Sequence, residues 1–182
     1  CAQIGGGGRK MTASSFRSHA AELLKFCRER GYNDHVALLW DLARHSGRRR
    51  FAVWDFREGR AMHLFVAGHG SGCAASHVRS ARARVSDEAG SHLSSVGHAL
   101  VAERYVGRYG VAYRLDGLDE TNASLRRRCV VLHGWRYTTS FPIWPAATVG
   151  SWGCPVLSVR DMATLDAVLR QERHVVLWAY MQ

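Results

Sequence analysis

The spacing of the hydrophobic residues changes along the chain at about residue 36. Before that point, apolar side chains from Ala20 to Cys27 recur at intervals of three or four, which is the spacing of one helix face. Gly31 follows, at a position where helices commonly end. The pattern predicts a helix over about 16–30 whose apolar face packs against the rest of the protein.

From residue 36 onward the apolar residues fall in short runs separated by turns, and each run has the length of a strand. The predicted strands are Val36–Leu42, Phe51–Phe56, Met62–Ala67, Leu100–Tyr105, Val111–Leu115, Cys129–His133 and Val175–Tyr180. A helical pattern covers 160–170, and the stretches 68–97 and 135–153 are expected to be loops. We therefore expect a mainly β (α+β) fold, a twisted β-sandwich with an N-terminal helix and peripheral helices.

At 182 residues the chain can bury the core of one domain. We expect a flexible leader over 1–12, an N-terminal helical segment over 13–35, and a main domain over 36–182. No apolar run approaches the ~20 residues of a membrane span. Because the chain starts with Cys1 and not Met, we expect a processed or truncated product whose export signal is missing. A lipid anchor on Cys1 and a plain fragment boundary both stay open.

The formal net charge of +10 favours an anionic partner, either nucleic acid or an anionic wall or membrane surface. The arginine runs at 48–50 and 126–128 each precede an apolar run, so we interpret them as solvated strand ends. Nothing resembles a nucleic-acid recognition helix, so no specific nucleic acid is expected. The histidines and cysteines form neither a CxxC pair nor an HExxH helix, so no metal site is expected.

Five cysteines leave at least one unpaired thiol. Cys27 on the predicted helix face and Cys129 at the start of a predicted strand are expected to be small buried hydrophobes. Cys73 follows a glycine-rich loop, and both pairing and a free thiol stay open for it.

Candidate chemistry lies in the segment Ser151-Trp152-Gly153-Cys154, which begins 17 residues after Gly134 of the pair His133-Gly134. A cysteine attacks carbonyls as a thiolate and needs a base, which is most often histidine. Glycine before the nucleophile leaves backbone N–H groups able to hold an oxyanion. The segment predicts cysteine acyl transfer, with Cys154 as nucleophile, His133 as base, and the N–H groups of Gly153 and Cys154 as oxyanion donors.

The same segment resembles the L,D-transpeptidase catalytic domain of the YkuD type, whose signature is a His, a gap, and then Ser/Thr-His-Gly-Cys. Trp152 stands where that signature has its second histidine. A divergent branch, the murein L,D-transpeptidase catalytic-domain-like proteins, reads Ser-x-Gly-Cys-Pro, and Ser151–Pro155 resembles this branch. Further segments that resemble the family in order are Val66–Gly72, Ser94–Gly97 and Tyr113–Leu118, so that the similarity covers roughly residues 36–182.

The resemblance implies further site residues. Ser151 matches the signature Ser/Thr and either orients the loop or the imidazole or is a plain turn residue; Trp152 either forms a pocket wall or packs the loop. A backbone carbonyl, of Gly134 or a neighbour, is expected to orient the imidazole. The candidates for substrate contact are Trp152, Gly134, Tyr113, Arg114, Ser94, Ser95 and His69. For His69 a surface-loop role stays open, and for Arg114 a solvent-facing role does.

What the resemblance implies is a peptidoglycan cross-linking enzyme of the bacterial periplasm or cell envelope. It would join donor and acceptor stem peptides through a thioester acyl-enzyme, forming 3,3 or 1,3 cross-links without a cofactor, against an anionic cell wall. Reaction of Cys154 with carbapenems is a further hypothesis. The alternatives are an L,D-carboxypeptidase or cysteine amidase on wall peptides, and a catalytically degenerate basic wall-binding module.

Overall fold

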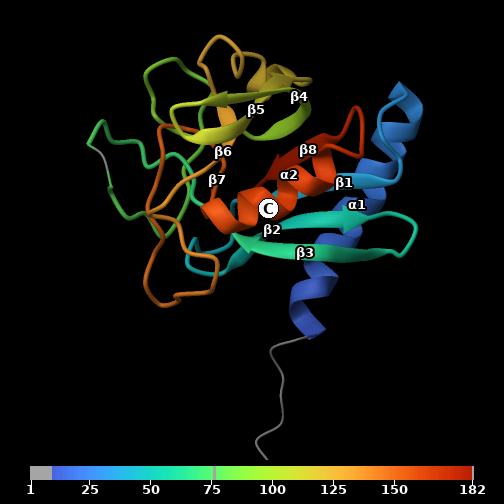
Figure 1. Ribbon diagram of the computed structural model, residues 1–182, viewed down its shortest axis with the longest axis horizontal. Coiled ribbons are helices and arrows are strands. Elements are labelled where there is room, and N and C mark those ends of the chain that lie inside the picture. The colour runs from blue at the N-terminus through green and yellow to red at the C-terminus, as the bar shows by residue number, and fades with distance from the viewer. Residues whose placement is uncertain (1–9, 76, 182) are drawn as a thin grey trace, which may run out of the picture.

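The computed structural model describes residues 10–75 and 77–181 (Figure 1). Cys1 with its proposed anchor, and most of the predicted leader, lie outside these residues. Helix α1 (Lys10–Arg30) begins before the expected residue 16 and takes in the last three residues of the predicted leader. No helix within the described ranges is long and apolar enough to cross a membrane.

Eight strands form one continuous sheet in the order β3-β2-β1-β8-β4-β5-β6-β7. Their bounds are β1 (Val36–Asp41), β2 (Arg49–Asp55), β3 (Arg60–Val66), β4 (Gly97–Gly107), β5 (Gly110–Gly117), β6 (Val131–Gly134), β7 (Val156–Leu157) and β8 (Val176–Tyr180). A 3₁₀ turn η1 (Glu120–Asn122) and the helix α2 (Val159–Leu169) complete the fold. The mainly β, α+β expectation is confirmed.

Two hydrophobic cores pack against the sheet, and β1 contributes side chains to both. Every residue of β1 is buried. Its alternate side chains face opposite sides of the sheet, and a hydrophobic core covers each side. Leu38 and Trp40 join the main core together with residues of β5, β6 and α2. Leu39 joins a second core, in which α1 contributes Phe16 and Leu23. The two ends of the sheet and α2 therefore share one core, which is how a single sheet provides the sandwich-like layers expected from the sequence (Figure 1).

The expectations for Cys129 were wrong, and one short strand beside the site was missed. Cys129 is exposed, has a φ of 55°, and precedes β6 instead of beginning it. β7 was not predicted, because two residues carry no alternation pattern that a sequence can reveal. This short strand nevertheless decides the geometry of the site, since it pairs in parallel with β6 directly after the nucleophile turn.

Candidate active site

Strand β6 holds the predicted base beside the turn that carries the predicted nucleophile. His133 pairs with Ala112 of β5 on one side and with Val156 of β7 on the other. Because β7 begins two residues after Cys154, this pairing keeps the nucleophile at the edge of β6. The N–H of Val131 donates a hydrogen bond to Cys154 Sγ over 3.4 Å. The structure thus brings Cys154 and His133 into one strand-and-turn unit.

Ser151 braces the turn from inside. Its Oγ donates to the carbonyl of Cys154 at 2.6 Å and accepts from the N–H of Gly153 at 3.2 Å. Its own N–H donates to the carbonyl of His69 at 2.8 Å, which ties the turn to the glycine-rich loop. The side chain of Ser151 therefore fixes the backbone on both sides of the nucleophile, which agrees with the loop-orienting role that was left open.

Gly153 occupies a backbone conformation and a space that only glycine fits. Its φ is 119°, and a Cβ there would lie 2.9 Å from the carbonyl oxygen of Leu93 and 3.3 Å from Nη2 of Arg128. The carbonyl of Gly153 accepts a hydrogen bond from Ser94 Oγ at 2.9 Å, and Ser94 Oγ accepts in turn from the N–H of Gly70 at 2.9 Å. The turn is therefore held from outside by the segment around Ser94.

The imidazole of His133 is buried and oriented by its own strand. Its Nδ1 donates to the carbonyl of Gly134 at 3.0 Å, which leaves Nε2 as the nitrogen able to accept a proton. Gly134 lies close to α2, because a Cβ there would be 3.1 Å from Cβ of Met162. The ring of Tyr109, at the tip of the β4–β5 hairpin, stacks on the imidazole with centroids 4.5 Å apart.

Burial favours the neutral forms of both Cys154 and His133. Burial raises the pKa of the Cys154 thiol, while the N–H of Val131 and the charge of Arg128 act in the opposite direction. Burial also lowers the pKa of His133, against a smaller opposing effect of the Gly134 carbonyl. At neutral pH the resting pair is therefore a thiol and a neutral imidazole, which suits general-base activation of the thiol.

Of the two N–H groups expected to hold the oxyanion, the structure makes only that of Cys154 a candidate. The N–H of Gly153 is engaged by Ser151 Oγ, so it does not face a substrate. Cys154 supplies the remaining N–H of the predicted pair. Because a peptide unit is planar, the bond from Ser94 to the Gly153 carbonyl also fixes the direction of the Cys154 N–H on the other side of that unit.

Arg128 is a site residue that the sequence reading missed. Its side chain is 4% exposed and lies 3.3 Å from the carboxylate of Asp87. It donates to the carbonyl of Leu93 at 2.6 Å and to Ser95 Oγ at 2.8 Å. It therefore holds the segment that contacts Gly153 and places a buried cation whose charge stabilises the thiolate of Cys154. The sequence showed only an arginine run.

Comparison with known proteins identifies the family of the chain. The family model described as the L,D-transpeptidase catalytic domain matches residues 8–180. The chain belongs to the L,D-transpeptidase catalytic-domain family. This match confirms the resemblance drawn from the signature segment, and the family is one of bacterial cell-wall proteins that act on peptidoglycan.

No curated protein matches the chain. A similar solved structure is that of the L,D-transpeptidase from Xylanimonas cellulosilytica. It has 15% sequence identity and a TM-score of 0.46, over 86% of this chain and 68% of that chain.

Within this L,D-transpeptidase domain, His69 does not reach the substrate side. It is 0% exposed, with Nδ1 against the guanidinium of Arg50 and Nε2 at 3.1 Å from Ser80 Oγ. Burial and the Arg50 charge lower its pKa to about 3. The expectation of a substrate contact was wrong for His69, because its ring is enclosed in a buried polar network.

Ser94 and Ser95 support the nucleophile turn and are not open to substrate. Ser94 is 0% exposed, and its Oγ is engaged by Gly70 and Gly153. Ser95 Oγ donates to Asp87 at 2.7 Å and accepts from the Arg128 guanidinium. Both residues belong to the site, but as backbone supports in place of the expected substrate contacts. Gly134 is similarly buried, and its role is to orient His133.

The neighbouring residues Tyr113 and Arg114 face opposite sides of β5. Tyr113 is buried, and its hydroxyl donates to Asp166 of α2 at 2.7 Å, so the expected substrate contact was wrong for it. Arg114 lies opposite Val131, whose N–H contacts Cys154 Sγ. It is exposed, with its guanidinium 5.2 Å from the ring centroid of Tyr105. Arg114 therefore stays a candidate for a substrate carboxylate.

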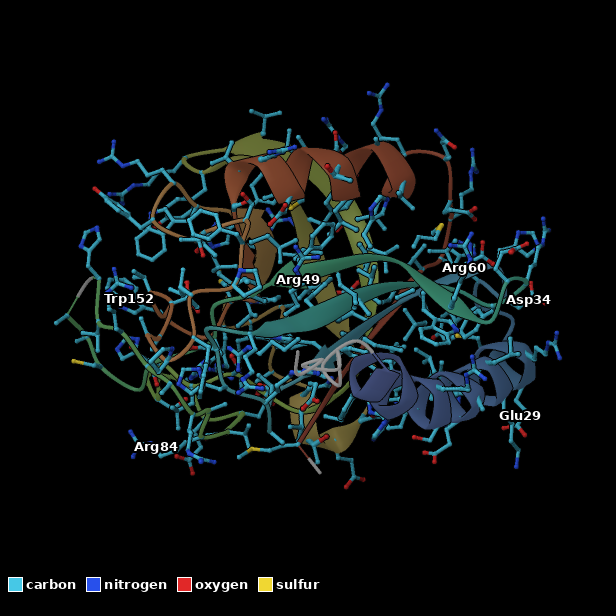
Figure 2. All side chains as sticks on the ribbon, turned by 90° about the horizontal axis from the view of Figure 1, so that it is seen from below. Glu29, Asp34, Arg49, Arg60, Arg84 and Trp152 are labelled. Atoms are coloured by element: carbon cyan, nitrogen blue, oxygen red, sulfur yellow. The ribbon has the colours of Figure 1, made fainter. Side chains whose placement is uncertain are left out.

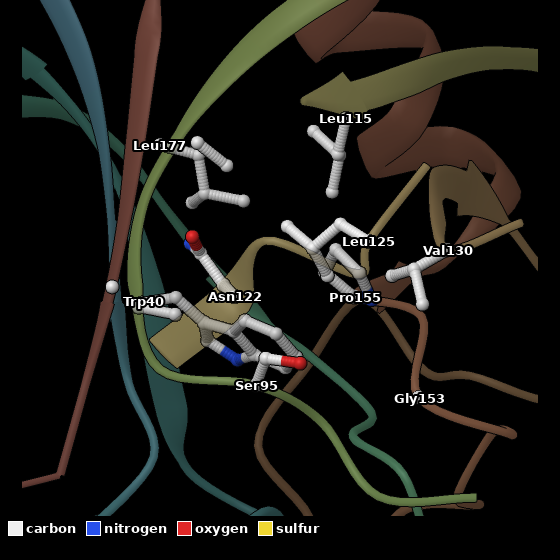
Figure 3. Close-up of a pocket in the computed structure, with 12 residues that line it drawn as sticks. Trp40, Ser95, Leu115, Asn122, Leu125, Val130, Gly153, Pro155 and Leu177 are labelled. Atoms are coloured by element: carbon white, nitrogen blue, oxygen red, sulfur yellow. The ribbon is translucent and has the colours of Figure 1, made fainter. Parts of the chain in front are cut away.

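Trp152 is 59% exposed and contacts His92, at the loop-rich end of the molecule opposite Glu29 and Asp34 (Figure 2). The cavity behind the turn, lined among others by Trp40, Ser95 and Gly153, measures about 10 Å³ (Figure 3). Such a space is water-sized, so it admits no peptide to the turn from this side.

No group of three or more His, Cys, Asp or Glu side chains that could hold a metal ion occurs within residues 10–75 and 77–181.

Proposed function

We propose that the chain is a peptidoglycan L,D-transpeptidase that works by cysteine acyl transfer through Cys154. The supporting observation is the unit formed by β6 and the nucleophile turn. In it, the N–H of Val131 contacts Cys154 Sγ, and Gly134 fixes the tautomer of His133. The family provides the substrate class, and the geometry supports the assignment of roles.

In the first half-reaction, Cys154 Sγ attacks the carbonyl carbon of the L-centre at stem position three, and Nε2 of His133 takes the thiol proton. The N–H of Cys154 stabilises the oxyanion. The bond from this carbonyl carbon to the nitrogen of the D-residue breaks, and His133 returns the proton to the leaving amine. A thioester acyl-enzyme and a free D-amino acid result.

In the second half-reaction, an amine of a second stem attacks the thioester carbon and gives a proton to His133. The carbon–sulfur bond breaks, and Cys154 is protonated again. One peptide bond is exchanged for another, so the acyl energy is conserved and no cofactor enters the balance. Attack by water at this step would give an L,D-carboxypeptidase.

The charge distribution supports action at an anionic cell wall, in the periplasm or cell envelope. Arg79, Arg82 and Arg84 are exposed, and none of them is paired with a carboxylate in the described part of the chain. The loop that carries Arg79 runs beside the nucleophile turn, since Arg79 bridges to Val149. Arg84 lies on the same side of the molecule as Trp152 (Figure 2).

The test uses disaccharide-tetrapeptide muropeptides with the wild-type protein, Cys154→Ala, and Cys73→Ala as a matched control at an exposed thiol. Mass spectrometry should find cross-linked dimers and released D-amino acid with wild type and Cys73→Ala, and neither with Cys154→Ala. Fragmentation would then distinguish 3,3 from 1,3 linkage. Tripeptide without dimer would favour the carboxypeptidase, and no product with any variant would favour the degenerate wall-binding module.

A further inference from the structure

One aromatic ring covers the proposed base and comes from a part of the chain that carries no signature residue. Tyr109 stacks on His133 with centroids 4.5 Å apart and an interplanar angle of 25°. Tyr109 is 47% exposed, whereas His133 is 4% exposed. The imidazole therefore has the phenol ring between one of its faces and solvent.

The hairpin geometry brings Tyr109 to this place. Gly107 and Gly110 pair at the end of β4 and β5, which leaves Arg108 and Tyr109 as the tip. Gly110 has a φ of 77°, a conformation that glycine adopts without strain and that closes tight hairpins. Because Ala112 of β5 pairs with His133, the tip extends past the end of β6 and lies over the imidazole.

Two contacts together determine the orientation of the imidazole. The bond from Nδ1 to the Gly134 carbonyl fixes one edge of the ring, and the stacked Tyr109 fixes the plane of its face. With both contacts in place, the direction in which Nε2 points is fixed. A ring held only by the bond to Gly134 would still turn about that bond, and small misplacements of a reacting group cost large factors in rate.

We propose that Tyr109 is a positioning residue of the transpeptidase site, which holds the plane of the His133 imidazole and shields it from water through its aromatic ring. This rests on the proposed function, in which His133 is the base. The hydroxyl of Tyr109 does not contribute to this role. We therefore expect phenylalanine at position 109 to preserve the function of the ring, and a small side chain to lose it.

The protonation of His133 gives the proposal a readout of its own. Burial lowers its pKa and the Gly134 carbonyl opposes that shift. Loss of the Tyr109 ring exposes the imidazole to water, so its pKa should rise toward the ordinary ~6.5. The protonated, inactive form would then persist to higher pH.

Other titratable and charged groups on the elements around His133 would stay unchanged in this experiment. The hairpin carries Arg108, whose guanidinium lies 5.8 Å from the ring centroid of Tyr109. The turn carries Cys154, and β5 carries Arg114 opposite Val131. On β5, Asp116 is bonded to Arg126, and Tyr113 is bonded to Asp166 of α2, as is Arg104 of β4. The remaining groups are Arg160 and Asp161 of α2 and Arg170 at its C-terminal end.

The experiment compares wild type with Tyr109→Ala, Tyr109→Phe and Val106→Ala, an exposed control on the same hairpin. The His133 titration is followed by NMR, with its signal assigned by its loss in His133→Gln, and dimer formation is measured from pH 5.5 to 8.5. We expect Tyr109→Ala to raise the His133 pKa and to lower kcat/KM about tenfold at neutral pH, with a larger loss at acidic pH. Tyr109→Phe and Val106→Ala should keep both the titration and the rate of wild type.

An unchanged titration and rate in Tyr109→Ala would overturn the proposal, and so would a Tyr109→Phe variant as impaired as Tyr109→Ala. Because the NMR titration does not depend on turnover, failure of the proposed function is a distinct result. The wild-type protein could make no dimers while its His133 titration still depended on the ring at position 109. That result would refute the proposed reaction and support the orienting and shielding contact.

Discussion

Replacing Ser94 by alanine tests whether the nucleophile turn depends on support from a distant segment. The Ser94 hydroxyl bridges the Gly70 N–H and the Gly153 carbonyl, each at 2.9 Å, and the side chain is 0% exposed. Ser94→Ala removes this bridge and leaves two buried backbone groups without it.

The magnitude follows from those two groups. An unsatisfied buried donor or acceptor costs roughly 1–3 kcal/mol, so the expected loss of unfolding free energy is about 3 kcal/mol after some relaxation. In a protein of this size each kcal/mol lowers the melting temperature by roughly 2–4 °C, which predicts a fall of about 6–12 °C.

The effect on rate has a separate cause. The Gly153 carbonyl and the Cys154 N–H belong to one planar peptide unit, so freeing the carbonyl lets the oxyanion donor tilt. Removal of a whole oxyanion donor costs ~10²–10³ in kcat, and a tilted one should cost about tenfold, with KM little changed. Thermal unfolding and muropeptide kinetics measure the two effects.

Ser86→Ala is the matched control, because Ser86 Oγ accepts only an exposed N–H from Glu88, at 3.1 Å. It should change stability by no more than about 0.5 kcal/mol and leave the rate unaffected. If Ser94→Ala lost stability but kept the wild-type kcat, the argument through the Gly153–Cys154 peptide plane would be refuted.

The remaining predictions concern the turn, the thiol and a reassigned residue. Gly153→Ala should lower the free energy of unfolding by about 2–4 kcal/mol, measured by chemical denaturation, since backbone strain adds to a close contact. Gly59→Ala is the control: Gly59 also has a positive φ but open space around it, so the loss should be about 1–2 kcal/mol. Alkylation of Cys154, followed by peptide mass spectrometry, should rise from pH 6 to 9 without a plateau, because burial raises the thiol pKa; a plateau below neutral pH would contradict a neutral resting pair. Arg128→Gln should slow that alkylation at fixed pH by removing a stabilising cation, and an unchanged rate would disprove this effect. Tyr113→Phe should lose about 1 kcal/mol of stability while KM stays constant, and a raised KM would restore its substrate role.

The sequence predicted the elements that carry a repeating pattern and missed those defined by a few residues. Long strands such as β1 and β2 were found within a few residues, because their apolar runs fill a buried sheet. β7, with two residues, and the early start of α1 at Lys10 have no comparable signal. The paired positions of His133 and Cys154 could be predicted because their spacing itself is the signature.

The supporting contacts could not be predicted, because they join segments far apart in the chain. Ser94 meets Gly153 across 59 positions, and Arg128 meets the Leu93 carbonyl across 35. One error was avoidable from local physics. Side chains alternate along a strand, so Tyr113 and Arg114 could not both face the same site, and the register with β6 decides between them.

The departure from the signature at Trp152 leaves the contacts that shape the turn intact. The contacts that shape the turn come from the Ser151 hydroxyl and from backbone groups of Gly153 and Cys154, and none of them uses the side chain at 152. That side chain is 59% exposed and contacts only His92 among the aromatic rings of the described chain. The imidazole that we propose for proton transfer is instead that of His133, which the Gly134 carbonyl orients. Because these contacts do not use the side chain at 152, the absence of the signature histidine there removes no contact that holds the proposed nucleophile or the proposed base.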